Sequence, residues 1–142
     1  MELLNEHQRR ALSNRLAMLD RFFYDVHELL GSESLRGDMF EVINNLTPEQ
    51  REQLVGLMNE GRGEIRATRD QFNLAVKREY AHRVVAGHLS IFWTILEDSR
   101  AAKLEGFGGV SPDLAAELDP KIENLVRVVN SMKSLVTAED AK

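Results

Sequence analysis

Residues 84–96 read VVAGHLSIFWTIL and form the most apolar run of the sequence. As a helix, this run is apolar around most of its circumference, so we expect neighbouring helices to surround it on several sides. Gly87 and Ser90 would allow another backbone to approach closely. The run contains His88 and ends after 13 residues, well short of the roughly 20 that a membrane helix needs. It predicts the central helix of a soluble protein.

The segments on either side of this run also have a helical pattern. A first helix is predicted over residues 2–30 and should end at Gly31, because its apolar residues recur at spacings of three and four. These residues are Leu12, Leu16, Leu19, Phe23, Val26 and Leu30. A short helix is expected over residues 34–45. The last helix carries a similar stripe, made of Leu114, Leu118, Ile122, Leu125, Val129, Met132 and Val136.

Each of the three prolines directly follows a residue that caps helices. The pairs are Thr47-Pro48, Ser111-Pro112 and Asp119-Pro120. Proline suits the first helical position because it lacks an N–H that would be unpaired there, and the preceding side chain accepts bonds from the next free amides. Gln50 completes a capping box with Thr47. The pairs predict helix starts at Pro48 and Pro112, and a bend or restart of the last helix at Pro120.

Residues 48–103 stay helical in pattern without a further proline. An unbroken helix of this length would extend roughly 84 Å, which is too long for a compact domain of this size. We expect a break near Gly61 and Gly63, because each glycine costs about 1 kcal/mol inside a helix. The remainder, residues 64–103, would then form one long helix.

The composition is that of one domain that can bury a core. The chain has 142 residues, of which 43% are hydrophobic and 29% charged, and a formal charge of −5. The absence of cysteine excludes disulfides, cysteine-based zinc sites and thiol catalysis. The N-terminus lacks the basic and apolar stretches of a secretory signal. We therefore predict one cytoplasmic all-α domain over residues 1–142, an antiparallel four-helix-type bundle with one long central helix.

The charge pattern argues against nucleic-acid binding. Residues 47–103 contain nine basic and eight acidic side chains, interleaved along the chain. This alternation is typical of a solvated helix face. A nucleic-acid surface would need an uncompensated basic patch with exposed aromatic residues. We expect neither a nucleic-acid nor a membrane partner.

Histidine chemistry provides two alternatives. Glu79 and His82 have the Glu-x-x-His spacing of di-iron bundles, which would place both ligands on one helix face, but no second copy of the motif exists. Arg83 and His88 have an Arg-x4-His spacing that resembles the motif of the HEPN ribonucleases. For His88, as for His27, a core histidine bonded to a backbone carbonyl is the favoured interpretation. We expect no enzyme activity, cofactor or metal, and a metal-binding or ribonuclease bundle around His82 and His88 stays an alternative.

Three segments, in order along the chain, resemble the Rsd/AlgQ family of bacterial regulators that bind the primary sigma factor of RNA polymerase. They are AMLDRFFYDVHELL at 17–30, AGHLSIF at 86–92 and LDPKIE at 118–123. The resemblance implies a non-enzymatic helical protein that covers the sigma surface otherwise used to contact core polymerase or promoter DNA. It also implies that Asp20, Arg21 and Phe22 are the first residues to consider in that contact.

Self-association is the other alternative. A helix of about 40 residues extends beyond a compact bundle of this size, so long helices of two copies could pair. The sequence is thus also compatible with a homodimer, or a higher homo-oligomeric bundle, of another role.

Overall fold

The computed structural model describes residues 3–140 and shows a mostly helical protein. Helices account for 73% of it and strands for 4%, which confirms the all-α class. The chain divides into two compact units, Met1–Lys77 and Arg78–Lys142, each of which we describe by itself. A single domain over residues 1–142 stays a prediction.

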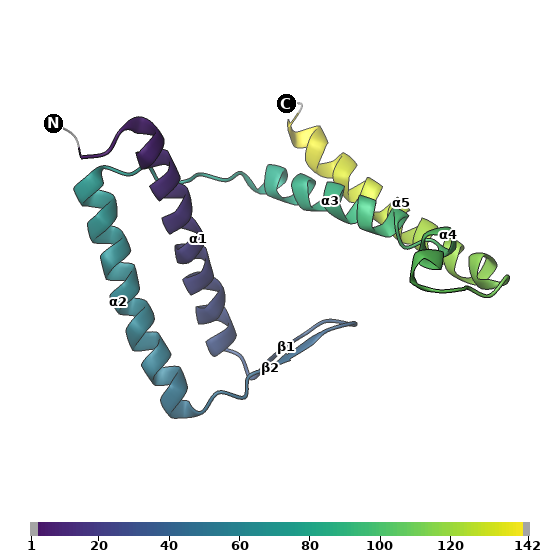
Figure 1. Ribbon diagram of the computed structural model, residues 1–142, viewed down its shortest axis with the longest axis horizontal. Helices are drawn as coiled ribbons and strands as arrows, with labels where there is room; N and C mark the ends of the chain where they lie inside the picture. Colours follow the sequence, from purple (N-terminus) through teal and green to yellow (C-terminus); the bar gives the residue numbers. More distant parts are fainter. Residues whose placement is uncertain (1–2, 141–142) are drawn as a thin grey trace. The chain divides into compact units, whose positions relative to one another are not determined.

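The first unit is built on two long helices that lie side by side, α1 (Glu6–Leu30) and α2 (Pro48–Phe72) (Figure 1). Helix α1 begins where Asn5 forms a capping box with Gln8, in which the Asn5 side chain accepts from the Gln8 amide at 2.8 Å. It ends at Gly31, as predicted. The predicted first helix is confirmed over Glu6–Leu30, whereas residues 3–5 precede the helix and residue 2 lies outside the described residues.

Helix α2 begins at Pro48, and its capping box between Thr47 and Gln50 confirms the prediction made from the Thr47-Pro48 pair. The expected break near Gly61 and Gly63 is wrong, because α2 continues through both glycines. A Cβ atom at Gly61 would lie 2.9 Å from the ring of Phe23 on α1. Gly61 therefore allows the two helices to approach each other closely rather than interrupting α2.

The predicted long helix over residues 64–103 is also wrong. Helix α2 ends at Asn73, which adopts the left-handed conformation with φ 52° and ψ 53°. Asparagine is one of the few residues other than glycine that enters this conformation readily. No regular structure is present from residue 74 to residue 80, and the chain becomes helical again only at Ala81.

A β-hairpin replaces the short helix predicted over residues 34–45. Strands β1 (Ser34–Arg36) and β2 (Glu41–Ile43) pair antiparallel, with Leu35 opposite Val42. The amide of Gly37 donates to the carbonyl of Phe40 at 3.0 Å and closes the turn. Gly37 and Asp38, two residues typical of turns, follow the first strand, and the β-branched Val42 and Ile43 lie in the second, which favours a hairpin over a helix.

Asn44 fastens this hairpin to the end of α1. Its side-chain Nδ2 donates to the carbonyls of Leu29 at 3.3 Å and Ser32 at 3.0 Å. One side chain thereby bonds two carbonyl groups at the C-terminal end of α1, where carbonyls lack partners within the helix.

The second unit consists of α3 (Ala81–Glu97), the short α4 (Ala101–Leu104), a 3-10 turn η1 (Glu105–Phe107) and α5 (Leu114–Asp140). Helices α3 and α5 lie side by side and run in opposite directions (Figure 1). The buried side chains of this unit come from α3, α4 and α5, and they are Leu89, Ala101, Ile122 and Val126.

The helix start predicted at Pro112 and the restart predicted at Pro120 need correction. Helix α5 begins at Leu114, two residues after Pro112, following a turn in which the Leu114 amide donates to the Ser111 carbonyl. It continues through Pro120 without a restart. Asp119 does not cap the helix that contains it, because its Oδ1 accepts from the Ala101 amide at 2.9 Å and so caps the start of α4.

That several helices surround the central helix stays a prediction. Within its unit, α3 packs against one long helix, α5, and its residues Ile91 and Phe92 are exposed. The long central helix is thus replaced by a helix of 17 residues.

The contact between α1 and α2 can be tested with a pair of glycines on α2. Apart from its chain neighbours and the nearby backbone of α2, no described atom lies within 4 Å of a Cβ placed at Gly56, so Gly56→Ala should stabilise the protein by about 0.5–1 kcal/mol through helix propensity. Gly61→Ala should lose that gain, because the added methyl meets the Phe23 ring and overpacking costs about 1–3 kcal/mol. Urea unfolding followed by far-UV circular dichroism measures both, and equal stabilisation by the two variants would contradict this packing.

Candidate functional site

The three residues predicted to contact a partner all lie exposed on α1. Asp20, Arg21 and Phe22 are consecutive, and about 100° separates successive residues of a helix, so they point to different sides. Phe22 is 59% exposed and Met18, one turn earlier, is 72% exposed. The ring centroids of Phe22 and Phe23 lie 6.3 Å apart. Phe22 and Met18 therefore form an apolar pair on the surface of α1.

The structure does not bring the proposed metal ligands onto one helix face. Helix α3 begins at Ala81, so His82 is helical while Glu79 precedes the helix. The ring of His82 instead lies 6.3 Å from the ring of Tyr80. Among the described residues, no group of three or more His, Cys, Asp or Glu side chains could hold a metal ion.

Arg83 and His88 also fail to form a common site. Both lie on α3, but five residues correspond to about 140° of helical rotation, so their side chains leave opposite sides of the helix. His88 is exposed, and its Nδ1 lies 2.9 Å from the Val84 carbonyl oxygen. The backbone hydrogen bond expected for His88 is present, but its predicted burial is wrong. His27 on α1 is exposed too.

A polar junction joins the end of α3 to α5. The Arg100 guanidinium contacts Glu97 at 2.9 Å and Glu123 of α5 at 2.7 Å. The hydrogen bond from Arg100 lowers the pKa of Glu97, and the bonds to Glu97 and Glu123 raise the pKa of Arg100. Because the positive and negative groups of this cluster bond one another, we interpret it as a connection between helices rather than as a catalytic site.

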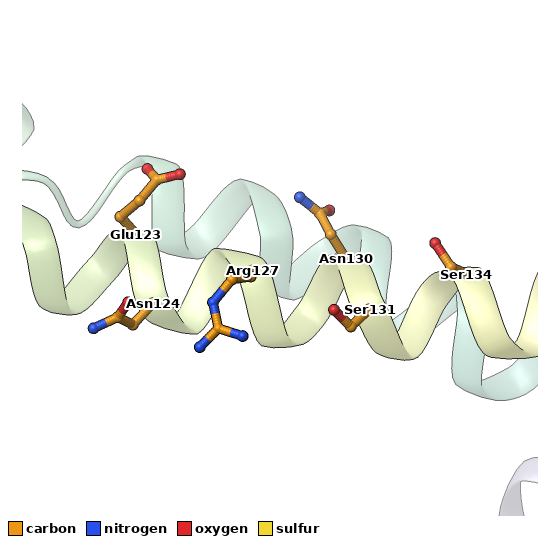
Figure 2. A pocket seen from close by; sticks show the side chains of 6 residues that line it. All are labelled: Glu123, Asn124, Arg127, Asn130, Ser131 and Ser134. Carbon is orange, nitrogen blue, oxygen red and sulfur yellow. The ribbon is translucent and has the colours of Figure 1, made fainter.

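Figure 2 shows a polar row that lines a shallow depression on the second unit. Its members are Glu123, Asn124, Arg127, Asn130, Ser131 and Ser134. All six side chains project from α5 alone. Ligand sites are usually concave and gather polar groups from several elements, so this row is better described as the solvated side of one helix.

One group of exposed apolar side chains on the second unit is shared by α3 and α5. On α3 it consists of Val85, Phe92 and Ile95 with His88 between them, and on α5 of Leu125, Val128, Met132 and Leu135. The seven apolar members are between 36% and 73% exposed. We call these eight residues the apolar layer. Sequence reasoning missed it by assigning Leu125 and Met132 to the core stripe.

Both halves of the apolar layer lie on the same side of the α3–α5 pair. On each helix, the exposed stripe is rotated by roughly 100° in the same sense from the buried residues, Leu89 on α3 and Ile122 and Val126 on α5. Two antiparallel helices are related by a two-fold axis perpendicular to the plane of the pair. Equal rotation therefore turns both stripes toward one side of the pair.

The lowered pKa of Glu97 gives a pH dependence that can be measured. A carboxylate with a lowered folded-state pKa stabilises the protein above its ordinary pKa of about 4.3, and this contribution is lost as pH falls through the lowered value. Glu97→Gln should therefore lower the melting temperature at pH 7, and the difference from the wild type should disappear toward pH 3. Glu105→Gln, at an exposed glutamate in η1, is the control. A difference for Glu97→Gln that persists unchanged at pH 3 would refute the ion pair's role.

No described helix combines the length and the apolar character that crossing a membrane requires. Comparisons with protein-family models, curated proteins and solved structures found no match for this chain. The similarity to the Rsd/AlgQ family therefore stays a prediction from the three sequence segments.

Proposed function

We propose that this protein is a non-enzymatic regulator that acts by protein–protein interaction, and that its partner is the primary sigma factor of RNA polymerase. The observation that carries the proposal is the exposed pair of Phe22 and Met18 on α1, next to Asp20 and Arg21. These residues belong to the longest segment that resembles the Rsd/AlgQ family. The proposed partner places the activity in the cytoplasm.

The chemistry of this surface suits a protein contact. Aromatic residues and arginine are enriched among the few residues that dominate binding energy, and the polar groups around them exclude water without adding much affinity. Phe22 and Met18 can supply the apolar anchor, while Asp20 and Arg21 can fix its orientation through charged hydrogen bonds. A Phe side chain in a partner's pocket is removed from water at a gain of about 1.5–3 kcal/mol.

The net charge supports the same kind of partner. The chain carries a formal charge of −5, and the DNA-contacting surface of a sigma factor must be basic in order to bind phosphates. Opposite charges accelerate association more than they strengthen the final complex. The acidic charge therefore favours encounter with a DNA-binding surface, and the apolar pair on α1 provides the lasting contact.

The four-helix arrangement expected from the sequence belongs to this proposal. Each unit pairs two long helices, α1 with α2 and α3 with α5. A helix pair has a free side on which further helices can pack. We propose that, in the functional form of the protein, further helices pack on the free side of a helix pair and complete a four-helix arrangement.

Titration of purified primary sigma factor against the protein in a calorimeter tests the proposal. We expect micromolar or tighter binding, and a loss of at least tenfold in affinity for Phe22→Ala, the equivalent of about 1.4 kcal/mol. Tyr24→Ala is a matched control, because Tyr24 is also 59% exposed but lies on the other side of α1. Absence of binding at micromolar concentration would exclude the sigma factor as the partner, and equal losses for both variants would exclude this surface.

A further inference from the structure

We infer that residues 75–80 form a site of limited proteolysis, at which an endoprotease that accepts basic side chains cuts directly after Lys77 or Arg78. A cut at this site divides the chain where its two compact units meet in sequence, since the first ends at Lys77 and the second begins at Arg78. The inference does not rest on the proposed sigma contact, which uses α1.

Residues 75–80, which we call the linker, connect α2 to α3 without forming a helix or a strand (Figure 1). The chain before the linker is fixed, because the Leu74 side chain is buried and the Leu74 amide donates to the Arg69 carbonyl at 2.9 Å. The chain after it is fixed where α3 begins at Ala81. The six linker residues can span at most about 20 Å. Proteases bind their substrates as extended segments of several residues, so the linker suits them without local unfolding.

Every residue of the linker is exposed. Even its large apolar side chains reach solvent, since Val76 is 69% exposed and Tyr80 is 59% exposed. Lys77 and Arg78 lie at the centre of this exposed stretch. Trypsin-like proteases select a basic side chain through an aspartate in the pocket that receives it. The linker therefore offers such a protease two consecutive residues of the required charge.

The other basic residues of the described chain are less suited to this reaction. Apart from Lys77, Arg78 and Arg100, all of them within residues 3–140 lie in a helix or a strand. A peptide bond inside such an element becomes available only when the element opens locally. Arg100 lies between α3 and α4, but its side chain is only 26% exposed and contacts Glu97 and Glu123. The linker should therefore be cut before any of these positions.

The reaction is the hydrolysis of one peptide bond by water. For the cut after Lys77, the C–N bond to Arg78 breaks, the hydroxyl of the water adds to the Lys77 carbonyl carbon, and the remaining proton goes to the Arg78 nitrogen. The helices α1 and α2 stay in one product, while α3 and α5 stay in the other. Both pairings of long helices therefore lie within a single fragment.

Digestion of the folded full chain with a small amount of trypsin, followed over time by intact-mass spectrometry, tests the inference. We expect the first products to be one fragment that ends at Lys77 or Arg78 and one that begins at the next residue. Lys77→Gln combined with Arg78→Gln should slow the first cut about tenfold or more, because the remaining sites require local opening. Arg66→Gln, at an exposed basic residue inside α2, should change neither the rate nor the position of the first cut.

A grafted lysine separates the role of the linker backbone from that of the two basic residues. In the doubly substituted chain, Val76→Lys should restore the early cut, because it returns a basic side chain to the linker. Glu60→Lys, at an exposed position inside α2, should not restore it.

Several outcomes would overturn the inference. They are a first cut after Arg36, Lys103 or any other residue outside the linker, a wild type that trypsin leaves uncut, and restoration of the early cut by both grafts. The sigma titration uses the intact chain and a contact on α1, so failure here leaves that result unaffected.

Discussion

Each long helix of this protein has one long helical neighbour within its unit, α1 with α2 and α3 with α5. This pairing determines which side chains each unit can bury. A helix paired with a single partner can bury only one stripe of its surface. In the second unit, the pairing of α3 with α5 buries Leu89, Ile122 and Val126. The apolar residues outside this stripe remain in water, although α3 is apolar enough for a helix with several neighbours. Within this unit, the helix pair therefore leaves apolar side chains that only a further surface could cover.

Local chemistry made several helix ends predictable from the sequence. Thr47 with Pro48 determines where α2 begins, and Gly31 determines where α1 ends, because each acts through hydrogen bonds within a few residues. Features that depend on a distant partner could not be predicted this way. Gly61 suggests a break until Phe23 of the other helix is placed beside it, and Asp119 suggests a local cap until Ala101 lies next to it.

The candidate surfaces were predictable to different degrees. The positions of Asp20, Arg21 and Phe22 on a helix follow from periodicity, but the exposure of Phe22 depends on how many helices surround α1, which periodicity does not specify. The half of the apolar layer on α5 had a signal in the sequence. Leu125, Val128, Met132 and Leu135 repeat at spacings of three, four and three. The predicted core stripe of this helix does not separate them from the buried face, because it combines Leu125 and Met132 with the buried Ile122.

The bond between Asp119 and the Ala101 amide has a consequence for dynamics. Helix α4 has only four residues, too few to be stable without tertiary contacts, so its first turn depends on a side chain supplied by α5. Exchange of the Ala101 amide hydrogen with solvent requires Asp119 to move away. This single amide is therefore an internal reporter of how often the Asp119 side chain of α5 leaves the start of α4, readable by hydrogen exchange without any label.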